Sequence, residues 1–114
     1  MPLLNIVSSN SVSDGTLDSF LAAASVMVSS MLGKSEKFVM INYQHNPDRM
    51  FAGSNTASAY VELKSLDLDE SKTTHYSSEI CQLCQNHLNV STDRIYIEFT
   101  NGSRHLWGWN NKTF

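Results

Sequence analysis

An internal repeat of about 57 residues constrains the fold of this chain more than any other feature. The apolar residues of the two halves correspond at a fixed offset of 56, as in Phe20 with Tyr76 and Val39 with Ile95. The end of a predicted helix and the start of the following strand coincide in both halves. We therefore expect a single domain spanning 1–114, built from two βαβ units at about 1–57 and 58–114.

The first half predicts a strand, a helix and a second strand. An apolar stretch covers Leu3–Ser8, and Ser13 or Asp14 is a suitable N-cap for the helix that follows. Apolar residues then recur at steps of four, three, four and three, which is typical of one helical face; they are Leu17, Leu21, Ala24, Val28 and Met31. Gly33 suits the helix C-terminus, Lys37–Tyr43 reads as a strand, and 44–57 reads as a loop.

The second half repeats this order. Residues 59–65 alternate between apolar and polar, as expected for a half-buried strand. A polar stretch over 67–74 leads into a helix that carries Tyr76, Ile80 and Leu88, and 94–100 alternates again. The aromatic tail 105–109 is expected to add a short edge strand.

Two parallel strand pairs joined in one sheet let both helices cover the same face. The expected fold is α/β of the α+β kind, with a four-stranded mixed sheet and two helices on one face. The opposite face would carry mixed aromatic and polar residues, namely Tyr60, Glu62, Lys64, Tyr96 and Glu98. No third helix is available to cover that face, so we expect another copy of the chain there.

Charge and composition exclude several classes of partner. Eight Lys and Arg against eleven Asp and Glu give a net charge of −3, which provides no basic surface for nucleic acid. No apolar run approaches the roughly 20 residues of a membrane span, and no signal peptide precedes the first strand. We therefore expect a cytoplasmic protein without a nucleic-acid or membrane partner.

The cysteines and histidines do not indicate a redox or metal site. Cys81 and Cys84 form a CxxC pattern, but both lie inside a predicted helix rather than at its start, which favours core thiols over a redox pair. The four histidines lack metal-ligand spacing. We expect neither a metal nor a cofactor.

Five short motifs occur in register along the whole chain. They are Met1-Pro2 before a strand, Leu32-Gly33-Lys34 at a helix end, Phe51-Ala52-Gly53-Ser54, Asp93-Arg94-Ile95-Tyr96-Ile97, and the C-terminal Gly108-Trp109-Asn110-Asn111-Lys112-Thr113-Phe114. Together they resemble the macrophage migration inhibitory factor and D-dopachrome tautomerase family.

The resemblance implies a homotrimer and a cofactor-free keto–enol tautomerase acting on small aromatic α-keto acids of the phenylpyruvate or dopachrome type. Pro2 would be the catalytic base, exposed when Met1 is removed. The resemblance places Lys34 and Leu66 beside it, Tyr96 and Glu98 from the neighbouring subunit, and Trp107 and Phe114 near the pocket mouth.

These residue types suit proton transfer at carbon. A base works best with a pKa near ambient pH, and an α-amine starts near 7.7–8.0, well below the usual 10.4 of lysine. An apolar pocket and a neighbouring cation would lower that pKa further. Lys34 could therefore hold a substrate carboxylate and also disfavour protonated Pro2.

Each assignment has a structural alternative. Pro2 can be simply a stiff terminal residue, Lys34 can complement a helix dipole, and Tyr96 can be an interface tyrosine. Two residues depart from the family pattern: Glu98 stands where vertebrate members have asparagine, and Asp67 where the family usually has glycine. These departures put the substrate preference and the shape of the loop after the third strand in doubt.

A second function class remains open from sequence. The chain could be a secreted, cytokine-like trimer that binds a cell-surface receptor, with weak or vestigial tautomerase activity. Cytokine members of the family also lack a signal peptide, so extracellular localisation stays open. Pro2 separates the two classes, because only the enzyme requires its free amine.

Overall fold

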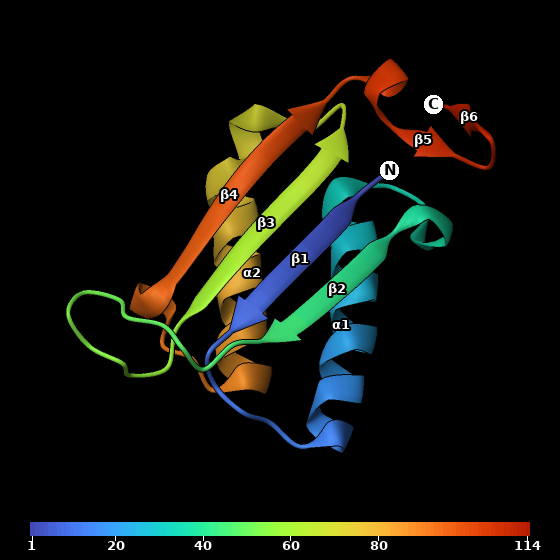
Figure 1. Cartoon of the computed structure of the whole chain (residues 1–114). Helices are drawn as coiled ribbons and strands as arrows, with labels where there is room; N and C mark the ends of the chain where they lie inside the picture. Colours follow the sequence, from blue (N-terminus) through green and yellow to red (C-terminus); the bar gives the residue numbers. More distant parts are fainter.

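Two strand-helix-strand units follow one another in the computed structural model, which describes residues 1–114 (Figure 1). The first contains β1 (Leu3–Ser8), α1 (Asp14–Leu32) and β2 (Met40–His45). The second contains β3 (Ala59–Leu66), α2 (Thr73–Leu88) and β4 (Ile95–Gly102). Each half thus has the element order that the repeat predicts.

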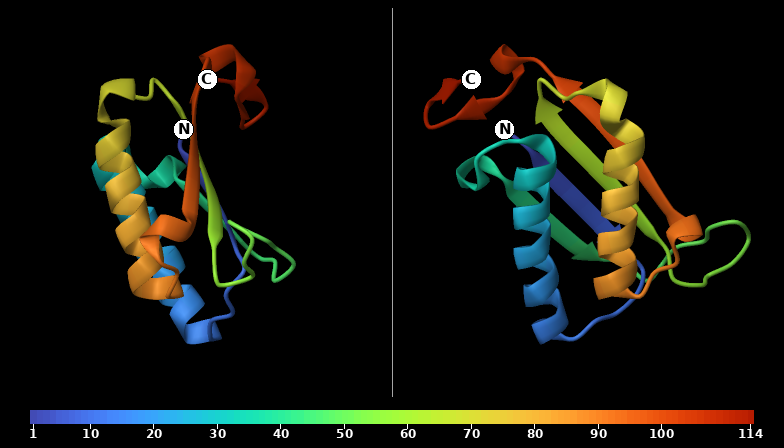
Figure 2. Two further views of the ribbon diagram at one scale, coloured as in Figure 1. Left: turned by 90° about the vertical axis from the view of Figure 1, so that its left-hand side faces the viewer. Right: turned by 180° about the vertical axis from the view of Figure 1, so that it is seen from behind.

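The four long strands form one mixed sheet in the order β2-β1-β3-β4. β1 is parallel to β2 and β3 is parallel to β4, whereas the central pair β1–β3 is antiparallel. Both helices lie on the same face of this sheet (Figure 2). The predicted fold class, a four-stranded mixed sheet with two helices on one face, is confirmed.

The ends of α1 follow from its sequence. The Ser13 hydroxyl accepts a hydrogen bond from the Thr16 amide at 3.2 Å, which satisfies one of the free amides of the first turn. Gly33 ends the helix in the left-handed region at φ 64°, where glycine has no steric penalty. Its amide and that of Lys34 bond back to the carbonyls of Ser30 and Ser29.

The core fills the space between the sheet and the two helices. Its largest wholly buried side chains include Phe20, Leu4, Ile6, Leu63 and Ile80. By length and composition alone α1 would also suit a membrane span. In this fold its inward face, with Phe20, Ala24 and Val28, packs in the core, as in the core helix of a globular domain.

The other face of the sheet is largely polar, as the alternation predicts. The Asn5 amide donates to the Glu62 carboxylate at 3.3 Å, and the Tyr60 hydroxyl donates to Glu98 at 2.7 Å. Lys64 forms an ion pair with Glu62 at 3.1 Å. No element of this chain covers these side chains, so the face is free to contact another molecule.

Two sequence-based expectations about strands are wrong. The tail does not join the sheet: Arg104–Leu106 form a 3-10 turn, and β5 (Gly108–Trp109) pairs only with β6 (Lys112–Thr113). The second strand begins at Met40 rather than Lys37, because Glu36–Phe38 form another 3-10 turn. The Ser35 hydroxyl caps that turn by accepting from the Lys37 amide at 3.3 Å.

Candidate active site

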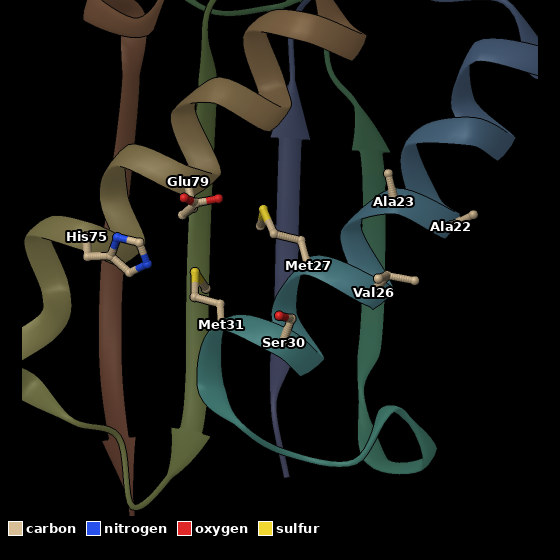
Figure 3. A pocket seen from close by; sticks show the side chains of 8 residues that line it. All are labelled: Ala22, Ala23, Val26, Met27, Ser30, Met31, His75 and Glu79. Atoms are coloured by element: carbon tan, nitrogen blue, oxygen red, sulfur yellow. The ribbon is translucent and has the colours of Figure 1, made fainter.

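The largest cavity of the molecule, about 760 Å³, lies between the two helices (Figure 3). Its walls are mainly apolar side chains of α1, including Met27 and Met31, and its ionisable groups are His75 and Glu79 of α2. None of the site residues predicted from the sequence lines this cavity. This groove is therefore separate from the predicted chemistry.

A smaller cavity of about 370 Å³ lies at the N-terminal end of β1. Segments far apart in the sequence meet there: the chain start, the turn after α1, the end of β3 and the C-terminal tail. Its lining residues are Met1, Lys34, Ser35, Phe38, Leu66, Asp67, Arg104 and Phe114. It combines three charged side chains and an amine with two aromatic rings, so it is the candidate active site.

Lys34 reaches this pocket because of the way α1 ends. The left-handed turn at Gly33 redirects the chain, and the Ser29 hydroxyl fixes the next residue by donating to the Lys34 carbonyl at 2.6 Å. The Lys34 ammonium donates to the backbone carbonyl of Leu66 at the end of β3. The lysine therefore bridges the two halves of the repeat at the pocket.

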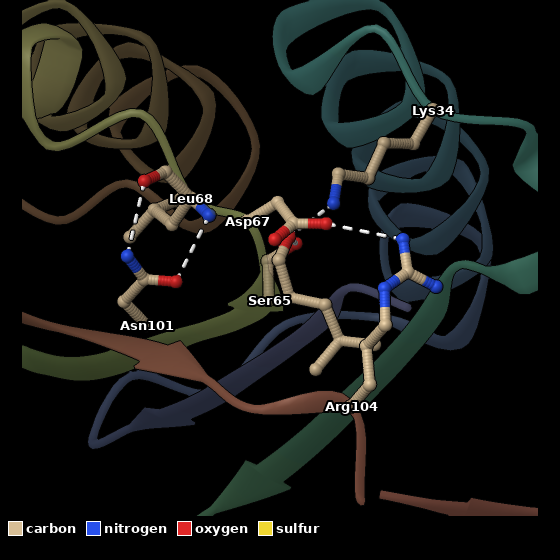
Figure 4. A network of polar contacts seen from close by, with 7 residues as sticks. Lys34, Ser65, Asp67, Leu68, Asn101 and Arg104 are labelled. Carbon is tan, nitrogen blue, oxygen red and sulfur yellow. Dashed lines mark hydrogen bonds and ion pairs between the residues drawn. The ribbon is translucent and has the colours of Figure 1, made fainter. Parts of the chain in front are cut away.

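The loop after β3 places a carboxylate opposite two cations. Asp67 adopts φ 52°, the left-handed region in which glycine is the least strained residue. The Asn101 side chain holds the next residue, accepting from the Leu68 amide at 3.1 Å and donating to its carbonyl at 3.2 Å. Asp67 then accepts from the Arg104 guanidinium at 3.2 Å, with Lys34 nearby (Figure 4).

The pocket lowers the pKa of its two amines. Burial lowers the pKa of the Met1 amine, the Lys34 and Arg104 cations lower it further, and Asp67 partly opposes them by raising it. Burial also lowers the pKa of Lys34, against the raising effect of Asp67. An amine at this position is therefore easier to deprotonate than one in water.

Aromatic rings form one side of the pocket. Phe38 packs edge-on against Trp109 at 5.3 Å and against Phe114 at 6.0 Å between ring centroids. Trp109 stacks on Phe114 at 5.7 Å with an interplanar angle of 15°. The tail hairpin thereby attaches to the 3-10 turn after α1, and the cluster gives the pocket an apolar wall suited to an aromatic ligand.

The structure brings together part of the predicted site. Lys34, Leu66 and Phe114 line the pocket beside the chain start. Pro2 is wholly buried at the beginning of β1, and its carbonyl accepts from the Met40 amide at 3.0 Å. Its nitrogen is the peptide link to Met1, a pocket residue, so loss of Met1 would leave that nitrogen facing the cavity.

Three predicted residues do not line the pocket of the single chain. The Trp107 indole packs beside Gly102, and its carbonyl accepts from the amide of the lining residue Phe114 at 3.1 Å. Tyr96 is 66% exposed and contacts Phe51, with 4.9 Å between ring centroids. Tyr96 is the second residue of β4, whose start lies at the end of the sheet away from the pocket, and Glu98 pairs with Glu62 near the middle of the sheet (Figure 1). Their predicted place in a neighbour's pocket stays a prediction.

Sequence reasoning missed several lining residues. Arg104 and Ser35 belong to no periodic pattern and to none of the motifs of the family resemblance, and Phe38 was identified only as part of a predicted strand. Asp67 was noted only as a change of loop shape. Its positive φ explains why glycine fits that position, but its ion pair with Arg104 depends on a contact between residues 37 positions apart.

The cysteines are placed largely as predicted. Cys84 is wholly buried in the core, and burial raises its pKa to about 12. Cys81 is half-buried one turn earlier on α2, and burial raises its pKa as well. Thiols with raised pKa values are poor nucleophiles, which fits core residues rather than a redox pair.

Known proteins resemble this chain over its full length. The family model described as Macrophage migration inhibitory factor (MIF) matches residues 1–114. The macrophage migration inhibitory factor homolog of Brugia malayi is 30% identical, with 100% of this chain and 99% of that protein covered. The crystal structure of the homologue from Prochlorococcus marinus has 37% identity and a TM-score of 0.92, covering 98% of both chains.

Proposed function

Because the chain belongs to the macrophage migration inhibitory factor family, we propose that it is a cofactor-free keto–enol tautomerase of small aromatic α-keto acids. The single observation that carries the proposal is the pocket at the start of β1. There Lys34 and an apolar aromatic wall lie beside Met1, and the Pro2 nitrogen would meet them once Met1 is removed.

In the proposed reaction Pro2 is the base. Its nitrogen takes a proton from the carbon next to the keto group, and the electron pair of that C–H bond moves to form the enolate. The enolate oxygen then takes up a proton, and the prolinium returns its own to solvent. The surroundings that lower the pKa of the Met1 amine support this role, since they would act on a Pro2 amine in the same way.

The side chains around Pro2 provide binding and orientation. Lys34 would pair with the substrate carboxylate, although its ammonium also donates to the Leu66 carbonyl and would have to share its hydrogens. Phe114, backed by Phe38 and Trp109, would contact the aromatic ring of the substrate. These two features support the proposed substrate class, acids that carry one carboxylate and one aromatic group.

We extend the proposal to the assembly, a homotrimer in which the polar sheet faces meet. Within one chain Tyr96 and Glu98 lie too far along β4 to reach the pocket of that chain. In the trimer they would complete the pocket of the neighbouring subunit. The open sheet face, which no element of the chain covers, supports this arrangement.

The test is phenylpyruvate tautomerisation by protein that mass spectrometry shows to begin at Pro2. Pro2→Gly should lower kcat by at least about 100-fold, because a positioned general base contributes roughly that much or more. Pro47→Gly is the matched control: it changes the other proline of the chain, in the loop between β2 and β3, and should leave kcat unchanged. Equal activity in Pro2→Gly and the wild type would disprove the proposed base.

A second candidate function draws on the names of the relatives, which include the macrophage migration inhibitory factor of Mus musculus at 26% identity. On this proposal the trimer acts outside the cell by binding a surface receptor. The enzyme proposal instead places the protein in the cytoplasm. If Pro2→Gly keeps full receptor-binding activity and the wild type lacks tautomerase activity, the second proposal replaces the first.

A further inference from the structure

Asp67 and Arg104 carry two of the three side-chain charges of the candidate pocket, and Lys34 carries the third. We propose that Arg104 supplies a second positive charge beside Lys34 and that Asp67 cancels it, so that the pocket selects acids with one negative charge over acids with two. The inference rests on the proposed function, because it assumes that the substrate carboxylate enters this pocket.

The charges of the lining side chains support this proposal. Lys34 and Arg104 are cations, Asp67 is an anion, and the other side chains of the pocket are uncharged. With a neutral amine at Pro2, the side chains of the site therefore carry a net charge of +1. A monoanionic acid balances this side-chain charge, whereas a dianionic acid brings one negative charge more than the side chains balance.

The geometry leaves Arg104 able to turn toward a ligand. A single nitrogen, Nη2, contacts Asp67 at 3.2 Å, and the side chains of Arg104 and Asp67 are 65% and 71% exposed. Exposed pairs with one contact are weakly held. Lys34 is different, since its ammonium is tied to the Leu66 carbonyl. Arg104 thus keeps more free hydrogen-bond donors than Lys34, because the guanidinium has five N–H groups and the ammonium has three.

The backbone fixes where the Asp67 charge lies. Asn101 holds the adjacent Leu68 through two hydrogen bonds, which fix the backbone from which the Asp67 side chain extends. At φ 52° a side chain carries a steric cost that glycine avoids. Asparagine tolerates this conformation, which makes Asp67→Asn a substitution that removes the charge and preserves the turn.

The experiment measures ligand binding by calorimetry at 0.15 M salt, with protein that begins at Pro2. The probes are 3-phenylpropanoate, a monoanion, and its para-carboxylate derivative, a dianion. Neither has a keto group, so binding is read without turnover. The selectivity is the ratio of the two dissociation constants, dianion over monoanion.

We expect three results. Asp67→Asn lowers the selectivity ratio about three- to fivefold, mainly by tightening the dianion, as for an exposed charge pair. Arg104→Gln weakens the monoanion by a similar factor. The double variant restores the net charge of +1 and returns the ratio to within about twofold of the wild type. Asp48→Asn is the control for overall charge, because it makes the same change in the loop between β2 and β3.

The outcomes separate this inference from the proposed function. Arg104-dependent binding with the expected ratios, in a protein that does not tautomerise phenylpyruvate, supports the inference and removes the enzyme proposal. Tautomerisation together with a ratio that Asp67→Asn changes no more than Asp48→Asn overturns the inference alone. Absence of binding of either acid to the wild type overturns it as well.

Discussion

Gly102, the last residue of β4, is a position at which one methyl group should disturb the tail. A Cβ there would lie 2.5 Å from Trp107 Nε1, 3.2 Å from Trp107 Cδ1 and 3.4 Å from Leu66 Cδ2. Ordinary contacts between such atoms begin near 3.5 Å, so the indole must move by about 1 Å. Gly102 does not have a positive φ, and alanine is therefore excluded by contact rather than by backbone strain.

The expected loss in the free energy of unfolding depends on how far the Trp107 indole can shift and on what moves with it. Overpacking of this kind costs about 1–3 kcal/mol, and we expect the lower end because Trp107 is only half-buried and can shift. A loss of about 1 kcal/mol corresponds to a fall in Tm of about 4 °C for a chain of this size. The Trp107 carbonyl accepts from the Phe114 amide at 3.1 Å, so the displaced indole also moves the aromatic wall of the pocket.

The assay is thermal unfolding of Gly102→Ala, followed by circular dichroism. Gly15→Ala is the matched control, because no atom lies within 4 Å of its added Cβ and alanine favours the helix that contains it. The control should leave Tm unchanged or raise it. Replacing Trp107 by leucine in the Gly102→Ala background should recover part of the loss. If Gly102→Ala unfolds at the same temperature as the wild type, the contact argument is refuted.

Two further predictions concern charge and pH. Lys34→Ala should raise KM for phenylpyruvate about tenfold with a smaller change in kcat, while Lys34→Arg keeps part of the affinity; steady-state kinetics with unchanged KM would remove its assigned role. Because burial raises the pKa of Cys84 to about 12, its thiol stays protonated when folded but ionises in the unfolded chain above about pH 9. Urea unfolding should therefore show stability falling between pH 9 and 12, and less steeply in Cys84→Ala.

The sequence was most informative where a pattern extends over several residues. Alternation predicted the two faces of β3, and the capping residues Ser13 and Gly33 predicted the ends of α1. The tail strands have two residues each, too few for any alternation to show what they pair with. Lys37 and Phe38 were assigned to the strand because they directly precede the β-branched and aromatic run from Val39 to Tyr43, and composition does not mark where that strand begins.

The candidate site was harder to predict, because tertiary contacts assemble it. Lys34 and Phe114 came from the family resemblance, and the pocket contains both. Arg104 belongs to a short turn after β4 and meets Asp67 only because β3 and β4 end side by side. The predicted role of Tyr96 requires a second copy of the chain, so the structure of one chain does not test it.

The antiparallel pairing of β1 with β3 has a consequence for how the protein folds. Asn5 and Glu62, which face each other in this pair, are 57 positions apart, and the pair lies at the centre of the sheet. Neither half can complete the sheet alone, since each would expose its inner strand as an unpaired edge. Folding must therefore wait for a distant contact. Conversely, if the chain were cut in the loop between β2 and β3, each fragment would expose the strand edge with which the other fragment pairs, β1 in one and β3 in the other.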